Sequence, residues 1–348
     1  EEALLDHAGA AIGPAWAATL SAHAAPLESG AEEVIDAILQ EAAERAHQRR
    51  LATRLRRRAS ASPDRPALQA AFCIDVRSEV FRRALEGSDA GIETIGFAGF
   101  FGLPVAHRAA ASDLTEAHLP VLLSPSLAST TAGPNEATNR IRSRAYRAWG
   151  RFRQAAVSSF AFVEAAGPLY AARLVRDALG LQPAAPAARP VPRLDPPLAT
   201  AEKAATATAV LRAMSMTGGH ARLVLLIGHG ASVTNNALES AYQCGACGGH
   251  TGEVSARLLA QLLNDPETRA ALPAMGIELP ADTLFVAGLH DTTTDRVTLF
   301  DHAAAGRHAA ELAQARSWLA KAGALVRAER ARHLPRATAA SVADRALD

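Results

Sequence analysis

Three short, largely apolar runs constrain the fold of this chain more than any other feature of its sequence. They are "ALQAAFCIDV" at 67–76, "ARLVLLIG" at 221–228 and "DTLFVAGLH" at 282–290. None of them alternates between apolar and polar residues along its whole length, which predicts strands buried on both faces. Helical patterns separate the runs, so we expect an α/β fold with a mostly parallel sheet and flanking helices.

Helical patterns and a proline-rich stretch divide the chain into five segments. Helices are predicted within 1–58 and 136–180, over about 200–214, and from an N-cap at Thr251 onward. The stretch "LQPAAPAARPVPRLDPP" at 181–197 predicts an extended, exposed linker. We expect an N-terminal helical segment (1–60), the first half of the α/β core (61–125), a helical insertion with the linker (126–200), the second half of the core (201–300) and a C-terminal helical segment (301–348).

Composition excludes several classes of protein. The 348 residues are 49% apolar and 20% charged and carry a net charge of +1, which argues against nucleic acid as a partner. Three cysteines are too few for a disulfide framework and fit thiols kept for metal binding or catalysis. The apolar run at 96–106 is about half of the roughly 20 residues that a membrane-spanning helix needs. The chain begins at Glu1 instead of methionine, so we expect it to be a portion of a longer protein.

The first candidate cluster lies at the end of the first apolar run. Cys73, Asp75 and Arg77 occupy alternate positions, and side chains two residues apart on a strand share a face. We therefore expect these three to point one way, while Ile74 and Val76 point the other way into the core. A thiol, a carboxylate and a guanidinium are costly to bury side by side unless something binds them.

The second candidate cluster follows the second apolar run. His229 lies between two glycines, and "CGACGGH" places Cys244, Cys247 and His250 just before a predicted helix. Sites in open parallel sheets form at the carboxyl ends of strands. If the two strands are neighbours, four side chains converge there. They are Cys73, Asp75, His229 and Cys244.

Two thiolates, an imidazole and a carboxylate make a reasonable tetrahedral zinc set. The Cys-x-x-Cys spacing of Cys244 and Cys247 leaves other interpretations open, because such a pair can also be a redox pair or two small buried residues. Cys247 and His250 are further candidate ligands.

The sequence around both clusters resembles a known family. "CIDVR" at 73–77 matches the Cys-x-Asp-x-Arg motif of β-carbonic anhydrases. Together with "GFAGFFGLP", "GHG", "CGACGG" and "HDTTTD", it resembles DabA, the large zinc subunit of the two-component DAB inorganic-carbon-accumulation complex. The resemblance implies a β-carbonic-anhydrase-like core with helical insertions. It also implies four zinc ligands, namely Cys73, Asp75, His229 and Cys244.

One feature departs from true β-carbonic anhydrases. Those enzymes place the histidine three residues before the second cysteine, whereas His229 and Cys244 are fifteen residues apart. The geometry of the loop between them therefore does not transfer.

The resemblance also implies a function. Bound zinc lowers the pKa of water to about 7, which suits the hydration of CO2 to bicarbonate. Asp75 and Arg77 form the catalytic dyad, and we expect Arg77 to gate hydration by drawing Asp75 off the zinc. The implied partner is a DabB-like ion-translocating membrane subunit, which places the chain peripherally on the cytoplasmic side of the cell inner membrane. Carbonic-anhydrase-like lyase chemistry would then be coupled to transport.

Two alternatives remain open at this point. A zinc hydrolase of the alkaline-phosphatase type also places aspartate and histidine at strand ends, although it uses more such ligands and no pair of thiolates. A structural zinc site in a membrane-associated scaffold would have a closed set of four ligands.

Two weaker features complete the analysis. Gly96, Gly99 and Gly102, with phenylalanines between them, form either an apolar lid over the site or a turn packed into the core. His290 and Asp291 either orient a metal ligand or pair with each other at a strand end.

Overall fold

The computed structural model describes residues 13–26, 29–55, 65–133, 135–154, 159–179, 190–233, 236–300 and 306–335. The chain forms two units, Glu1–Pro63 and Asp64–Asp348. In the first unit, the predicted helices are present as α2 (Gly13–Ala24) and α3 (Ala31–Leu55). The basic end of this segment, at 56–58, lies outside the described residues.

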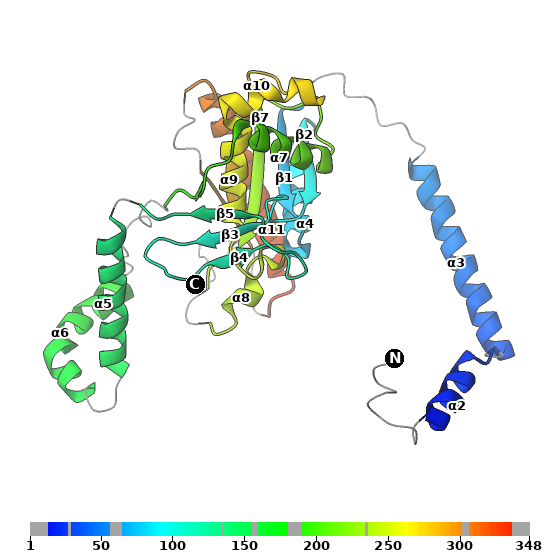
Figure 1. Cartoon of the computed structure of the whole chain (residues 1–348), viewed down its shortest axis with the longest axis horizontal. Helices are drawn as coiled ribbons and strands as arrows, with labels where there is room; N and C mark the ends of the chain where they lie inside the picture. Colours follow the sequence, from blue (N-terminus) through cyan, green and yellow to red (C-terminus); the bar gives the residue numbers. More distant parts are fainter. Residues whose placement is uncertain are drawn as a thin grey trace. The chain divides into compact units, whose positions relative to one another are not determined.

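A five-stranded sheet forms the centre of the second unit (Figure 1). Its strands are β1 (Leu68–Cys73), β2 (Ile92–Phe97), β7 (Leu223–Gly230), β8 (Leu284–Asp291) and β9 (Arg296–Leu299). The order is β2-β1-β7-β8-β9, with all neighbours parallel except the antiparallel pair β8 and β9. The three apolar runs are therefore confirmed as central parallel strands, and β1 and β7 are neighbours.

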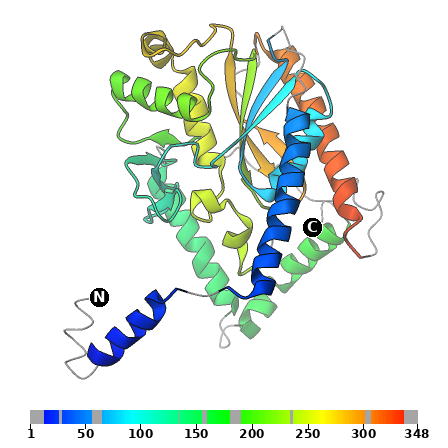
Figure 2. The same ribbon diagram turned by 90° about the vertical axis from the view of Figure 1, so that its right-hand side faces the viewer.

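Helices cover both faces of this sheet. The helices of the α/β core are α4 (Val76–Glu86), α7 (Thr200–Ala213), α9 (Glu253–Asn264), α10 (Pro266–Ala271) and α11 (Ala309–Ala331). Side chains of α7 and α9 pack with one face of the strands, and those of α4 and α11 pack with the other. Figure 2 shows α9, in yellow, and α11, in orange-red, on opposite sides of the sheet.

A second, four-stranded sheet in the order β4-β3-β5-β6 was not predicted. Its strands are β3 (Val105–Arg108), β4 (Glu116–His118), β5 (Leu127–Thr130) and β6 (Arg193–Leu194). Strand β6 belongs to the proline-rich stretch, so that part of the predicted linker pairs with β5 instead of running free. The remainder of the stretch, at 181–189, lies outside the described residues.

The remaining elements are short or lie in the predicted helical insertion. They are α5 (Glu136–Gln154), α6 (Ser159–Ala178), α8 (Glu239–Tyr242) and the 3-10 turns η1 (Gly245–Cys247) and η2 (Pro273–Met275). Helix α9 begins after an N-cap at Gly252, one residue later than the predicted cap at Thr251. In the described part of the chain, no helix is both long and apolar enough to cross a membrane. The five-segment division itself stays a prediction.

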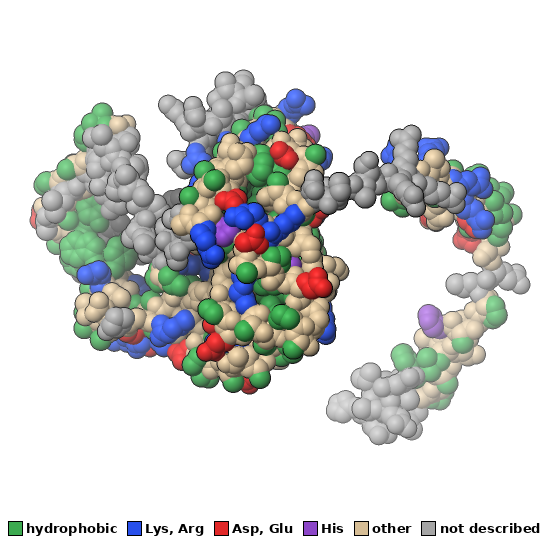
Figure 3. All heavy atoms as spheres, turned by 90° about the horizontal axis from the view of Figure 1, so that it is seen from above, with side chains coloured by type: hydrophobic (Ala, Val, Ile, Leu, Met, Phe, Trp, Pro, Cys, Tyr) green, Lys and Arg blue, Asp and Glu red, His purple; other side chains and the backbone are tan. Residues whose placement is uncertain are grey.

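The amino ends of the strands carry a network of ion pairs. Asp282 accepts hydrogen bonds from Arg65 at 2.8 Å and from Arg222 at 2.9 Å, and Arg222 also binds Glu311 at 2.7 Å. Figure 3 views this end of the sheet from above and shows basic and acidic side chains interleaved across it. These four charges are paired with one another, whereas the candidate ligands lie at the opposite, carboxyl ends of the strands.

Strand β7 and the start of α9 approach each other closely enough to require glycine on both sides. A Cβ atom added to Gly228 would collide with the backbone carbonyl of Gly252. The Gly252 N–H in turn donates to the His229 carbonyl at 2.9 Å. This contact fixes the backbone that carries His229.

Replacing Gly228 with alanine is expected to destabilise the protein by about 1–3 kcal/mol, because the new methyl group meets backbone that cannot move aside. The measurement is the free energy of unfolding in urea. Gly245→Ala is the matched control, since a Cβ there meets nothing within 4 Å in the described structure and the residue also neighbours a candidate ligand. Equal stability of the two variants would contradict the importance of this contact.

Candidate metal centre

Three candidate ligands meet where the strand order reverses. Strand β1 leads through α4 to β2 on one side, while β7 leads through α9 to β8 on the other, so the crevice between β1 and β7 is a topological switch point. Cys73 ends β1, His229 lies near the end of β7, and Cys244 follows α8. One donor atom from each of the three lies within 4.8 Å of the others.

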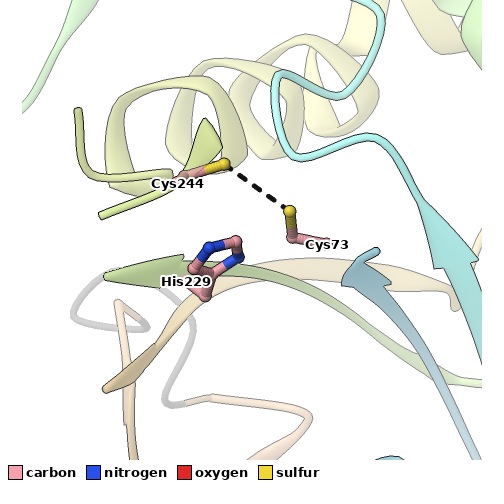
Figure 4. Close-up of side chains that lie close together, drawn as sticks. All are labelled: Cys73, His229 and Cys244. Atoms are coloured by element: carbon pink, nitrogen blue, oxygen red, sulfur yellow. Dashed lines mark hydrogen bonds between the residues drawn. The ribbon is translucent and has the colours of Figure 1, made fainter. Parts of the chain in front are cut away.

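The group is almost completely shielded from solvent. Cys73 and His229 are 1% exposed and Cys244 is 0% exposed. The two sulfur atoms are 3.6 Å apart, and Figure 4 shows the three side chains directed toward one another from separate segments. The structure therefore brings together three of the four predicted zinc ligands.

The loop that carries Cys244 is held by its own backbone. The Cys244 N–H donates to the His250 carbonyl at 3.1 Å, and the Cys244 carbonyl accepts from Gly249 at 3.0 Å. Gly248 and Gly249 have φ values of +67° and +81°, a region that favours glycine. The "CGACGGH" pattern thus encodes a tight loop that positions one sulfur.

The protonation of the cysteines prepares this sulfur to bind a metal. Hydrogen bonds from Cys247 and Cys73 hold the pKa of Cys244 well below its ordinary value, although burial opposes the shift. The pKa values of Cys73 and Cys247 are raised by the same hydrogen bonds and by burial. These directions favour the thiolate form of Cys244 and the thiol form of the other two cysteines. Cys247 therefore contacts Cys244 but lies outside the three-ligand group.

The predicted shared face of Cys73, Asp75 and Arg77 is wrong, because β1 ends at Cys73. Asp75 is instead the N-cap of α4, and its carboxylate accepts the Arg77 N–H at 2.8 Å. Ile74 and Val76, predicted to lie in the core, are 62% and 84% exposed. Because α4 begins at Val76, the side chains after Cys73 no longer alternate between the two faces of a strand.

Arg77 nevertheless reaches Asp75 from within the helix. Its Nε donates to Asp75 Oδ1 at 2.8 Å and its Nη2 donates to Oδ2 at 2.9 Å. Asp75 Oδ2 lies 3.4 Å from His229 Nε2, so the carboxylate borders the three-ligand group without belonging to it. Burial by itself would raise the pKa of Asp75, but the hydrogen bonds from Arg77 outweigh it and lower the pKa to about 2. The carboxylate therefore stays charged at neutral pH.

The residues present fit a metal ion. Nδ1 of His229 is buried and has no hydrogen-bond partner among the described residues, an arrangement that proteins avoid. Burial lowers the pKa of His229, so the ring is neutral at pH 7 and can offer a lone pair. A buried imidazole beside a thiolate and a thiol is a typical ligand set for a soft or borderline cation. The group Cys73, His229 and Cys244 could hold a metal.

Gly99 closes the space above the sulfur atoms. A Cβ atom there would lie 2.6 Å from Cys244 Sγ and would collide with Cys73 Sγ. Phe100 packs against the three cysteines, whereas Phe101 is a fully buried core residue. The burial of Phe101 agrees with the predicted turn packed into the core, whereas the lid stays a prediction, since Phe100 contacts the cysteines without showing such a role.

His290 and Asp291, the pair at the end of β8, belong to two different hydrogen-bond networks. Asp291 binds Ser232 in the loop that follows β7 and Thr293 in the loop that follows β8. His290 pairs in register with His229, but its nitrogens bind Ser78 Oγ at 3.3 Å and Asp295 Oδ1 at 3.2 Å.

Arg330 of α11 is a residue that sequence analysis missed. It donates to Asp295 and to the Arg77 carbonyl, each at 2.8 Å, and so joins the His290 network to the start of α4. Arg330 lies 253 positions from Arg77, and no local pattern links the two.

Gly99→Ala is expected to remove the metal although it changes no ligand, because the methyl group would occupy the space between the sulfurs. The measurement is metal content by mass spectrometry on the folded variant. Gly96→Ala is the control, since a Cβ there meets mainly the end of the Arg82 side chain, which can move. Full metal content in Gly99→Ala would show that the metal is not held between these sulfurs.

Comparison with known proteins identifies the family. A family model described as "Probable inorganic carbon transporter subunit DabA" matches residues 7–348. A protein of that description from Rhodopseudomonas palustris (strain BisB5) is 58% identical, covering 100% of this chain and 44% of the relative. One from Allorhizobium ampelinum is 58% identical over 97% of this chain and 42% of the relative, and one from Xanthomonas axonopodis pv. citri is 57% identical over 100% and 44%.

The chain therefore spans less than half the length of these curated relatives. No solved structure matches it. The family match covers almost every residue, including all three residues of the three-ligand group. The chain belongs to the DabA family.

Proposed function

We propose that Cys73, His229 and Cys244 hold a zinc ion, with Asp75 as an exchangeable fourth ligand. The observation that carries this proposal is the meeting of three buried ligands at the switch point, with a charged Asp75–Arg77 pair beside them. The Cys-x-Asp-x-Arg motif and the parallel strands also support a core like that of β-carbonic anhydrases.

Zinc in such a site acts as a Lewis acid that activates water for addition to CO2. The residues of this chain would control whether Asp75 occupies the fourth position on the zinc. Arg77 holds both oxygens of Asp75, which keeps the carboxylate 3.4 Å from His229 and off the three-ligand group. Rotation of Asp75 away from Arg77 would close the site, and its return to Arg77 would open it.

Arg77 is also placed to respond to events outside the site. Its Nη1 donates to the Tyr242 carbonyl at 2.8 Å, and its own carbonyl accepts from Arg330 of α11. Movement of either segment would change the hydrogen bonds that Arg77 donates to Asp75. We propose that a membrane partner controls hydration through this arginine.

The description of the relatives as subunits of an inorganic carbon transporter supports the same conclusion. We propose that the partner is an ion-translocating membrane subunit of the DabB type, and that the complex converts CO2 to bicarbonate in one direction. The chain would lie on the cytoplasmic side of the inner membrane.

A structural zinc site is the competing function, and the burial of all three ligands favours it. The two functions differ in what Arg77 does. In a structural site the arginine would matter only for stability, whereas in a gated site it would matter for carbon accumulation at normal zinc content. A hydrolase of the alkaline-phosphatase type would instead reveal itself by phosphatase activity of the zinc-loaded protein.

Arg77→Ala in the full-length protein, produced with its partner, is expected to retain zinc. Accumulation of radiolabelled inorganic carbon should fall about 10- to 100-fold, the usual effect of removing a residue that orients a ligand. Arg82→Ala is the matched control, since it removes an arginine from the same helix that binds Glu79 and Thr94 outside the site.

Normal accumulation by Arg77→Ala would refute the gate. Zinc lost from Cys73→Ala, His229→Ala and Cys244→Ala would support the ligand assignment. A properly folded wild type without zinc would overturn the proposed function.

A further inference from the structure

We propose that Glu116, His118 and His250 form a second binding site for a divalent cation, distinct from the cysteine centre. Glu116 and His118 lie on β4 of the second sheet, and His250 lies in the loop that carries Cys244. One donor atom from each lies within 4.8 Å of the others. None of the three residues is a ligand of the cysteine centre.

An unpartnered imidazole points to a ligand at this second site. His118 is 3% exposed, and its buried Nδ1 has no hydrogen-bond partner in the part of the chain that the structure describes. Burying a nitrogen without a hydrogen-bond partner is costly, so such a group is rarely retained without a role. Coordination of a cation would satisfy it.

The three side chains are already close to one another. The rings of His118 and His250 stack with centroids 4.5 Å apart and an angle of 6° between their planes. His250 Nδ1 lies 3.9 Å from Glu116 Oε2. Zinc bonds to nitrogen and carboxylate oxygen are about 2.0–2.2 Å long. An imidazole lone pair lies in the plane of its ring, so binding of one ion requires the partly exposed His250 ring to turn out of the stack.

The surrounding structure holds the group in place. A Cβ atom added to Gly248 would lie 2.6 Å from the Ala117 carbonyl, which shows how closely the cysteine loop packs on β4. The ring of His107 contacts that of His118 edge-on, at a centroid distance of 5.2 Å, and His107 is fixed by a 2.8 Å hydrogen bond with Ser129.

The ligand chemistry selects the cation. Two imidazoles and one carboxylate form the three-ligand set of open zinc sites, which leave one position for water or another small ligand. The set contains no sulfur, so it does not compete with the cysteine centre for the softest ions. The side chains of His250 and Glu116 are 32% and 44% exposed, which lets an ion enter from solvent.

The second site would act on the first through the backbone. The His250 carbonyl accepts the N–H of Cys244 at 3.1 Å, so a cation that immobilises His250 also immobilises the peptide carrying a ligand sulfur. Occupancy of the second site is therefore expected to stabilise the loop of the cysteine centre.

Titration of the metal-free full-length protein with Co2+ tests the proposal. Binding at the cysteine centre produces sulfur-to-cobalt charge-transfer absorption, whereas binding to nitrogen and oxygen produces only ligand-field bands. We expect two equivalents of cobalt per chain, of which one adds no charge-transfer absorption. Glu116→Gln and His250→Gln should each bind one equivalent, with the charge transfer retained.

Both substitutions are at partly exposed positions, so the variants are expected to fold, and circular dichroism checks this. His333→Gln removes an exposed histidine just after α11 and should keep both equivalents. Cys73→Ala should lose the charge transfer and keep the other equivalent, which separates failure of one site from failure of the other. The second site would be overturned if the wild type bound a single equivalent of cobalt, at the cysteine centre. It would also be overturned if the folded Glu116→Gln and His250→Gln variants still bound two equivalents of cobalt.

Discussion

The reversal of strand order between β1 and β7 is the constraint on which the rest of the site depends. Crossover connections leave these neighbouring strands in opposite directions, which creates a crevice at their carboxyl ends. Cys73 and His229 reach this crevice only because β1 and β7 are adjacent and parallel. The close approach of Gly228 and Gly252 then fixes the position of the His229 backbone relative to the start of α9.

Arg77 connects this crevice to the outside of the domain. It binds the carboxylate that caps its own helix, a carbonyl of the segment before Cys244, and, through its carbonyl, an arginine of α11. A guanidinium has five donors in a rigid fork, so it can maintain several such contacts together where a lysine could not. Arg77 thereby couples the ligand environment to two elements that a partner could displace, through its side chain to the segment before Cys244 and through its backbone carbonyl to α11.

The loop from Cys244 to His250 lies at the junction of the two sheets. One end supplies a sulfur to the cysteine centre, while the other supplies an imidazole that stacks on β4 of the second sheet. One backbone hydrogen bond, from the Cys244 N–H to the His250 carbonyl, joins these ends. The second sheet therefore contributes to the candidate centre, although it provides none of its three ligands.

The sequence by itself determined the central strands and which ends of them would meet, because wholly apolar runs separated by helices have few alternatives to a covered parallel sheet. It also indicated Cys73 and His229, since residues at the ends of buried parallel strands collect at one edge, and it indicated Cys244 through the "CGACGG" motif. Only the tertiary structure decided that Asp75 caps a helix, that Arg330 supports Arg77, and that His250 meets Glu116 and His118. The cap is a local contact that replaces the alternation of a strand, whereas the other contacts join residues on separate elements, and no periodic pattern records them. They follow from how the elements pack.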